Sequence, residues 1–498
     1  MTLAVVYGRA GLGVDAPLVH VEVHLANGLP SVSMVGLPET AVKESRDRVR
    51  GAILNSGFDF PTRRITINLA PADLPKDGGR FDLPIAIGIL AASGQIPREG
   101  LESWEFAGEL ALTGALRPVK GCLPVAVQAR RAQRKLAVPA DNGPEAALVH
   151  PGASYGPAHL LNITGQLAGT QALSPAQTDT GTTATPQPDL ADVRGQAGPR
   201  RALEIAATGG HSLLLSGPPG TGKSMLAERL PGILPPMTEH ESLETAAVLS
   251  LTANGFQPGW WGQRPFRSPH HSASHVSLIG GGTRPRPGEI SLAHNGVLFL
   301  DELPEFSRQA LEVLREPLES GRVTISRAAA QVDYPARFQL IAAMNPCPCG
   351  YLGDPVHPCT DTPEQIARYR SRISGPLLDR LDLQVEVPRL RPEEIQRSSG
   401  GESSALVRQR VVAAREHRLA ESGVPAAMLT PDALDAACGL GAGEQRFLSD
   451  ALDRLGLSAR GYHRLLRVAR TIADLDQAPR VTVQHLGEAL GYRRMIRE

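Results

Sequence analysis

The sequence predicts an α/β fold class, built around a parallel sheet that carries a phosphate-binding loop. Three observations lead to this prediction. Residues 217–224 read Gly-Pro-Pro-Gly-Thr-Gly-Lys-Ser and lie between the apolar run 212–216 and the helix-compatible stretch 225–230, the strand, loop and helix context of such a loop. Further short apolar runs are separated by long connections, as the crossovers of a parallel sheet require. From about Arg391 onward the pattern is helical.

Length and composition narrow the class of protein. The 498 residues suggest about three domains. The 51 basic and 51 acidic residues cancel, so overall charge does not indicate nucleic acid or an anionic membrane as a partner. No apolar run approaches the roughly 18 residues that span a bilayer, and the first residues lack the pattern of a secretion signal. Five cysteines without an export signal favour a reducing compartment, so we expect a cytoplasmic protein.

The composition divides the chain into four parts. Residues 1–164 alternate strand-like and helix-like segments, which predicts a separate α/β domain. Thr, Ala, Gln, Gly and Pro dominate residues 165–192, where no apolar period survives, so this stretch is predicted to be a flexible linker. The nucleotide motifs fall in residues 193–390, and residues 391–498 form the helical region.

Each residue type in the phosphate-binding loop has a chemical reason. The glycines let backbone N–H groups close around phosphate oxygens, Lys223 supplies a charge for the β and γ phosphates, and Ser224 supplies a hydroxyl for Mg²⁺. The following helix points its positive end at the anion. The residues predicted to bind the nucleotide and its Mg²⁺ are Gly217, Pro218, Pro219, Gly220, Thr221, Gly222, Lys223, Ser224 and Asp301.

Two other predicted strands also end in polar side chains. The apolar run 297–300 ends in Asp301 and Glu302, and the run 338–344 ends in Asn345. Because ligands of open parallel sheets bind at the carboxyl ends of the strands, these side chains can share one crevice with the phosphate-binding loop. Asp301 is placed to hold Mg²⁺, and Glu302 is placed to polarise an attacking water. The sequence therefore predicts hydrolysis of ATP or GTP.

Four longer stretches are more specific than these motifs. They are Pro-Phe-Arg-Ser-Pro-His-His at 265–271, a glycine-rich stretch at 280–296, Asp-Glu-Leu-Pro-Glu-Phe at 301–306 and a stretch at 371–382 that contains Leu-Leu-Asp-Arg-Leu-Asp. On these stretches the sequence resembles the YifB/ComM family of magnesium-chelatase-like AAA+ ATPases, over nearly the whole chain. The resemblance implies an AAA+ phosphate-loop core with an α-helical lid, preceded by an α/β domain like that of Lon-type (S5-type) proteases.

The resemblance also implies roles for further residues. Asn345 matches the sensor 1 amide, which orients the lytic water. Arg380 matches the arginine finger that completes a neighbouring subunit's site, because a guanidinium fits the oxygens that bear charge in the transition state. Arg460 matches the sensor 2 position in the lid, and Arg464, one helical turn later, is the competing candidate. An ordinary surface ion pair is the alternative for Arg380 and Arg460.

The family resemblance suggests an activity on DNA. It implies an ATP-dependent hexameric motor, a helicase that promotes branch migration of recombination intermediates during natural transformation. The implied cofactors are ATP and Mg²⁺, and the implied partners are single-stranded and branched DNA, further copies of the chain and recombination proteins, with no membrane. The rival interpretations are a magnesium-chelatase subunit, a protein-remodelling chaperone with Trp260 and Trp261 as pore aromatics, and a nucleotide-gated scaffold.

Two insertions between the nucleotide motifs are candidates for DNA contact. Residues 277–290 are glycine-rich and carry Arg284 and Arg286, and residues 321–335 read as a hairpin that carries Arg322 and Arg327. In a ring, loops at these places line the pore, and their arginines would contact phosphates without sequence preference. A solvated hairpin is an equally good interpretation.

The likeness of residues 1–164 to Lon-type proteases does not extend to their chemistry. The likeness is clearest at 75–84, but Arg80 stands where the nucleophilic serine is expected and Leu123 where the partner lysine is expected. A Ser-Lys mechanism has no nucleophile without that hydroxyl and that amine. We therefore expect this domain to be proteolytically inactive.

Three cysteines suggest a metal site. Cys347, Cys349 and Cys359 supply three thiolates, and a tetrahedral Zn²⁺ site takes four ligands. The resemblance implies a second Cys-x-Cys, which puts the fourth ligand at Asp361, while His357 lies two residues before Cys359. Either could complete the site, and imidazole is the better ligand for zinc. The alternative is a structured loop with three reduced thiols and no metal.

Overall fold

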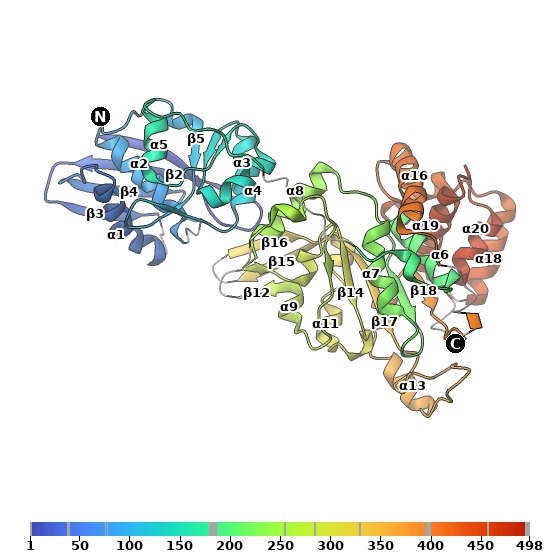
Figure 1. Ribbon diagram of the computed structural model, residues 1–498. Helices are drawn as coiled ribbons and strands as arrows, with labels where there is room; N and C mark the ends of the chain where they lie inside the picture. The colour runs from blue at the N-terminus through green and yellow to red at the C-terminus, as the bar shows by residue number, and fades with distance from the viewer. Residues whose placement is uncertain are drawn as a thin grey trace.

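The computed structural model describes residues 2–36, 40–74, 76, 78–178, 187–252, 255–282, 285–327, 330–391, 393–394, 400–455 and 458–493. The side chains at 40–43, 327, 330 and 452–455 lie outside that description. Figure 1 shows an α/β unit in blue and cyan, a second in green and yellow beside it, and helices in orange and red on the far side of the second. In the part of the chain that the structure describes, no helix is long and apolar enough to cross a membrane.

The first unit is a seven-stranded mixed sheet with helices against it, in agreement with the predicted α/β pattern. The strand order is β3-β4-β2-β1-β5-β8-β9, and β2 runs antiparallel to both β1 and β4. Helix α2 is buried along its whole length, because its sequence is apolar on all faces. The bounds are β1 Leu3–Arg9, β2 Leu18–Ala26, β3 Ser31–Val35, α1 Thr40–Asn55, β4 Arg64–Ala70, α2 Asp82–Ala92, β5 Trp104–Phe106, α3 Cys122–Arg131, β8 Lys135–Ala137, α4 Gly143–Val149, β9 Ser154–Tyr155 and α5 Leu160–Leu167.

The second unit contains the predicted parallel sheet. Five strands lie in the order β11-β14-β17-β10-β18, and all neighbours are parallel. Strands β10, β14 and β17 are completely buried, which explains why they read as unbroken apolar runs. The bounds are α6 Ala197–Gly209, β10 Leu213–Ser216, α7 Lys223–Ile233, α8 Glu239–Ser250, β11 Phe266–Arg267, β14 Val297–Leu300, β17 Gln339–Met344 and β18 Leu383–Glu386.

The two insertions form two-stranded ribbons that contact each other. The predicted hairpin at 321–335 is confirmed, with Arg322 opposite Pro335 in the antiparallel register. The Tyr334 hydroxyl donates to the carbonyl oxygen of Pro285, 2.9 Å away in the other insertion. The bounds are α9 His275–Ile279, β12 Gly280–Gly281, β13 Arg286–Pro287, α10 Glu289–Leu292, α11 Arg308–Glu312, α12 Pro317–Ser320, β15 Arg322–Arg327, β16 Ala330–Pro335, α13 Pro363–Arg370 and α14 Gly375–Leu378.

The C-terminal region is helical, as its sequence pattern predicts. Its helices share one hydrophobic core with α6 and the inner strands. The buried carboxylate of Asp474 receives Arg418 at 2.5 Å and Arg470 at 2.9 Å, so its charge is compensated inside the core. The bounds are α16 Ser404–Ser422, α17 Pro431–Cys438, α18 Ala442–Leu455, α19 Ala459–Leu475 and α20 Val483–Gly491.

The segment predicted as a flexible linker, residues 165–192, is mostly exposed where the structure describes it, but it is anchored at both of its described ends. Leu173 packs against the core of the first unit, and Ala176 donates its N–H to the carbonyl of Ser154. At the other end, Leu190 is buried in the core of the second unit, and the Asp189 carboxylate accepts the N–H of Ser404 at 2.7 Å. Polar composition without periodicity did not reveal these anchors.

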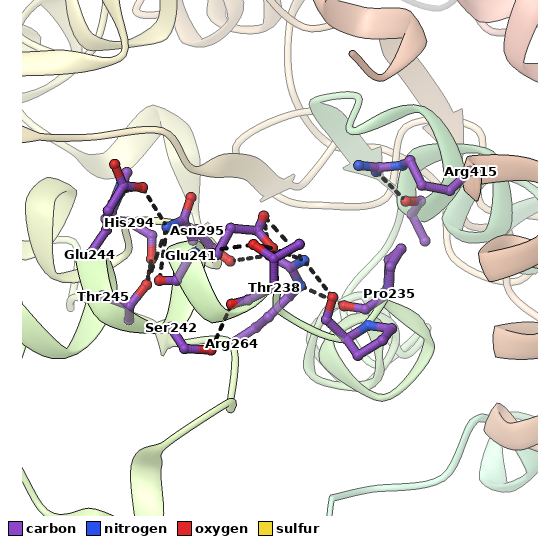
Figure 2. Close-up of polar contacts among 12 residues, drawn as sticks. Pro235, Thr238, Glu241, Ser242, Glu244, Thr245, Arg264, His294, Asn295 and Arg415 are labelled. Atoms are coloured by element: carbon purple, nitrogen blue, oxygen red, sulfur yellow. Dashed lines mark hydrogen bonds and ion pairs between the residues drawn. The ribbon is translucent and has the colours of Figure 1, made fainter. Parts of the chain in front are cut away.

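A polar network holds helix α8 on the amino side of the sheet (Figure 2). Arg264 donates to the carbonyl oxygens of Pro235 and Asn295, at 2.7 Å and 2.6 Å. The ring of His294 donates to Glu244 at 3.2 Å, and this contact is the main reason that the pKa of Glu244 falls to about 2. The opposite face of α8 packs against α3 of the first unit, so the network fixes the helix on which the first unit rests.

Candidate nucleotide site

The phosphate-binding loop runs from β10 into α7, as its sequence predicts. Gly220 and Gly222 have φ angles of 77° and 92°, which glycine adopts at no steric cost. A Cβ atom on Gly217 would lie 2.2 Å from the carbonyl oxygen of Val387, just after β18. The loop is therefore pressed against the neighbouring strand end, and its first position accepts only glycine.

Lys223 lies at the centre of this loop with its ammonium group held by oxygens. It is 9% exposed, and its Nζ donates to Gly217 O at 2.7 Å, Pro218 O at 2.9 Å and Asn345 Oδ1 at 3.1 Å. Burial lowers the pKa of Lys223, against the charges of Asp301 and Glu302. The lysine and the Asn345 amide, which the sequence placed after two different strands, are thus in direct contact.

The two residues predicted to hold Mg²⁺, Ser224 and Asp301, are in direct contact. The Ser224 hydroxyl donates to Asp301 Oδ2 at 2.6 Å. A hydroxyl at the start of the helix after the loop and a carboxylate at the end of a strand, here β14, are oxygen ligands that Mg²⁺ takes beside nucleotide phosphates. These two residues fit the ion, which would neutralise charge on the phosphate oxygens when bound.

Glu302 follows Asp301 in a left-handed backbone conformation, with φ of 52°. Such a conformation is strained in a residue other than glycine and is typical of functional turns. The Glu302 Oε2 atom lies 2.9 Å from His271 Nδ1. The sequence singled out the 265–271 stretch, which contains β11, only for its family resemblance and did not reveal this contact.

The arginines predicted as arginine finger and sensor 2 lie at the amino ends of the strands, opposite the phosphate-binding loop. Asp382 directly precedes β18, whose Leu383 pairs with Leu213, while the phosphate-binding loop follows Ser216. Four residues of strand, about 13 Å, therefore separate Asp382 from the loop. Arg464 donates to Asp382 Oδ1 at 3.0 Å, so it too lies on the amino side of the sheet.

Arg380 belongs to the same edge and is enclosed there. It is 7% exposed and donates to Glu319 at 2.5 Å and to the carbonyl of Pro376 at 2.7 Å. Burial lowers the pKa of Arg380, and the nearby charges of Arg315, Arg460 and Arg464 lower it further. The structure thus brings together the candidates for the arginine finger and for sensor 2. Because Arg464 is bonded to Asp382, these arginines lie away from the phosphate-binding loop of their own chain.

Three thiols converge directly after Asn345. The Sγ atoms of Cys347, Cys349 and Cys359 lie 3.4 to 3.6 Å from one another, and a carboxylate oxygen of Asp361 completes a four-residue group whose ligand atoms all lie within 4.8 Å. His357, the chemically preferred fourth ligand in the sequence, is outside this group. Its ring packs against Tyr351, with the ring centroids 5.0 Å apart, and its backbone N–H donates to the Asp354 carboxylate.

The candidate DNA-binding arginines are only partly described. Arg286 on β13 and Arg322 on β15 are exposed. Arg284 and the side chain of Arg327 lie outside the described residues. The two exposed arginines belong to the two ribbons that Tyr334 joins, so the ribbons carry positive charge into solvent.

Arg80 and Leu123 stand at the two positions where the family resemblance puts the serine and the lysine of a Ser-Lys mechanism. Arg80 donates to the carbonyl of Lys120 at 3.0 Å, and Leu123 is fully buried in α3. Neither position supplies a hydroxyl or an amine.

Taken together, the parallel sheet, the phosphate-binding loop and the Ser224, Asp301, Glu302 and Asn345 side chains define the core of a P-loop nucleotide hydrolase. Comparison with known families agrees. Residues 189–395 match the family described as magnesium chelatase, subunit ChlI. Residues 21–142 match subunit ChlI of Mg-chelatase, and residues 401–493 match the C-terminal part of that subunit. The chain belongs to this magnesium-chelatase-like family of AAA+ ATPases.

Similar proteins extend over the whole chain. Uncharacterized protein YifB of Salmonella typhimurium is 54% identical, and competence protein ComM of Haemophilus influenzae is 53% identical; each alignment covers 100% of this chain and 98% of the relative. The magnesium-chelatase 67 kDa subunit of Heliobacterium mobile is 27% identical over 33% of this chain and 29% of its own length. The resemblance to the YifB/ComM family is therefore confirmed.

Proposed function

We propose that this chain is an ATP-dependent DNA motor that works as a ring of six subunits, a helicase that promotes branch migration of recombination intermediates during natural transformation. The observation that carries the ring is the separation of two halves of one site. Lys223, Glu302 and Asn345 lie at the carboxyl edge of the sheet, while Arg380 lies on the amino side with Arg464. A guanidinium at that edge serves hydrolysis only if it reaches a neighbouring subunit's nucleotide.

The proposed cycle uses the described side chains in separate roles. Lys223 binds the phosphates, Ser224 and Asp301 orient Mg²⁺, and Glu302 accepts a proton from the water that attacks the γ phosphate. Asn345 orients that water. Arg380 of the adjacent subunit stabilises charge in the transition state, with Arg460 or Arg464 as a second cation from the same edge.

DNA as the substrate is supported by two features. The competence protein ComM aligns over the whole chain, and the two ribbons present Arg286 and Arg322 to solvent. A protein-remodelling motor would use an exposed aromatic pair, but Trp260 and Trp261 pack against the cluster formed by α3 and α8. The backbone phosphates of DNA therefore fit the ribbons better than a protein substrate does.

The native protein with ATP and Mg²⁺ should displace a strand from a forked duplex and move a four-way junction. The double variant Arg286→Ala, Arg322→Ala should bind single-stranded DNA more weakly and with a shallower salt dependence, because each lost phosphate contact removes about 0.7 from the slope of log affinity against log salt. Fluorescence anisotropy at several salt concentrations measures both quantities.

Arg131→Ala, an exposed arginine on α3, is the matched control and should bind DNA as the native protein does. An unchanged salt slope in the double variant would remove the ribbons from the mechanism. Hydrolysis that proceeds without strand displacement or junction movement on any DNA architecture would contradict the helicase.

We also propose that Cys347, Cys349, Cys359 and Asp361 hold one Zn²⁺. Zinc–sulfur bonds of about 2.3 Å in a tetrahedron place sulfurs about 3.8 Å apart, close to the separations in the structure. Metal analysis should find one zinc per chain, Cys349→Ser and Asp361→Ala should lose most of it, and His357→Ala should retain it. A folded native protein without metal would refute the site, and loss from His357→Ala alone would assign the fourth ligand to histidine.

A further inference from the structure

We propose that the loop at 11–16 in the first unit is a buttress that holds the ribbon β15–β16 in the orientation that DNA binding needs, with Leu12 and Gly13 as its positioning residues. This proposal rests on the proposed function, because it concerns a ribbon that we expect to contact DNA. It gives the first unit a part in DNA binding through the ribbon of the second unit.

The loop meets the ribbon directly. Residues 11–16 join β1 to β2, and Gly13 among them is buried with φ of 54°. A Cβ atom on Gly13 would lie 2.6 Å from Val332 Cγ1 and 3.9 Å from Tyr334 Cε1, both on β16. Leu12 packs against the hydrophobic cluster that contains these two side chains. In Figure 1 the ribbon lies on the side of the second unit that faces the first, so the backbone of one unit packs on side chains of the other.

The amino end of the loop is fixed by Arg80. A Cβ atom on Gly11 would lie 2.7 Å from Arg80 Nη2, so the guanidinium closes against the loop backbone. The same nitrogen donates to Lys120 O at 3.0 Å. Arg80 stands where the family resemblance puts a nucleophilic serine, and in this chain it supports the loop instead.

The carboxyl end of the loop is fixed by a buried ion pair. Arg9 Nη1 donates to Ala16 O at 3.2 Å. Two further nitrogens of this guanidinium donate to the Glu105 carboxylate at 2.6 Å and 2.7 Å, and both side chains are buried. A bidentate pair of this kind fixes the orientation of the guanidinium. The loop is therefore held at both ends by arginines of its own unit.

The ribbon depends on what packs against its buried face. Its side chains alternate, as in any strand: those of Val323, Ile325, Val332 and Tyr334 are buried, and those of Arg322, Thr324 and Ser326 are exposed. A two-stranded ribbon is marginally stable by itself, so contacts on the buried face determine how the exposed face is presented. Because the loop at 11–16 contacts the buried face at Val332, it helps to set the direction in which Arg322 meets DNA.

The test measures the ribbon and DNA binding separately in the full-length protein. Leu12→Ala removes packing, and Gly13→Ala adds a Cβ atom against Val332. In both variants amide hydrogen exchange in β15 and β16 should speed up on the order of tenfold, while β10 and β17 keep their native protection. Affinity for single-stranded DNA, measured by fluorescence anisotropy, should fall about three- to tenfold. The DNA-free kcat and the KM for ATP should stay at their native values.

Two matched variants make this result specific. Gly57 has a left-handed φ of 79°, as Gly13 has one of 54°, but a Cβ atom there would meet no described atom within 4 Å. Gly57→Ala therefore adds backbone strain without a contact to the ribbon, and it should keep the native exchange and DNA affinity. Leu12→Met keeps an apolar side chain of similar volume and should restore both quantities toward those of the native protein.

The outcomes separate this proposal from the proposed function. Native exchange rates in β15 and β16 of both Leu12→Ala and Gly13→Ala would overturn the buttress. Faster exchange with native DNA affinity would overturn the link to DNA, provided that the double variant Arg286→Ala, Arg322→Ala binds more weakly. A native protein that does not bind DNA would overturn the proposed function and the DNA part of this proposal, whereas the exchange rates would still test the contact.

Discussion

Glu302→Gln should reduce ATP hydrolysis by about 10²–10⁴-fold, while the protein still binds ATP and Mg²⁺. General-base catalysis contributes a factor of this size, and glutamine is close to glutamate in shape but accepts no proton. Ser224 and Asp301, 2.6 Å apart, remain in place to hold the ion. Steady-state phosphate release gives the rate, and binding of a fluorescent ATP analogue gives the affinity.

Two further variants make this result specific. Lys223→Ala should lose hydrolysis together with nucleotide affinity, because its ammonium is the charge at the centre of the loop. Glu305→Gln changes a neighbouring acid that pairs with Arg372 at the surface and should hydrolyse ATP as the native protein does. A Glu302→Gln protein with more than a tenth of the native rate would assign the base to another residue.

Arg380→Ala should reduce hydrolysis by about 10³–10⁵-fold, the effect typical of an arginine finger. The structure allows a sharp test of whether it acts on a neighbour. Arg380→Ala subunits keep Lys223, Glu302 and Asn345 but lack the arginine finger. Glu302→Gln subunits keep the arginine finger but lack the catalytic glutamate. Mixing the two nearly inactive proteins should restore hydrolysis, because a Glu302→Gln neighbour completes the Arg380→Ala site.

The mixing experiment has its own control. The double variant Arg380→Ala, Glu302→Gln offers neither half and should restore nothing when it is mixed with either single variant. If the mixture of single variants stays as inactive as its components, and size-exclusion chromatography shows that they assemble together, Arg380 does not act across a subunit boundary.

The sequence predicted those parts of the site that follow from local pattern and strand topology. The runs at 212–216, 297–300 and 338–344 are apolar because both faces of the parallel sheet are covered, and each ends in a polar residue at the same edge. The sequence alone therefore predicted that Lys223, Asp301 and Asn345 lie close together. The hairpin at 321–335 was visible for a similar reason, since its alternation is local.

The parts that escaped prediction depend on contacts between distant segments. The His271–Glu302 bond needs the register of β11, a strand of two residues that is too short to carry a pattern. Asp361 rather than His357 reaches the thiols because the loop's fold, not ligand preference, decides which side chain points inward. The packing of residues 165–192 rests on single anchors such as Leu173 and Leu190, which polar composition conceals.

The sheet that separates the phosphate-binding loop from the Asp382 edge also constrains assembly. A subunit that offers different halves of a site on its two sides cannot complete two sites with a partner through a two-fold axis, because like would meet like. Only head-to-tail contacts join unlike halves, and such contacts close into a ring or continue as an open filament. In a closed ring every interface holds one finished site, whereas any open arrangement leaves one nucleotide without its arginine. Closure itself would then be the step that brings the last site into use.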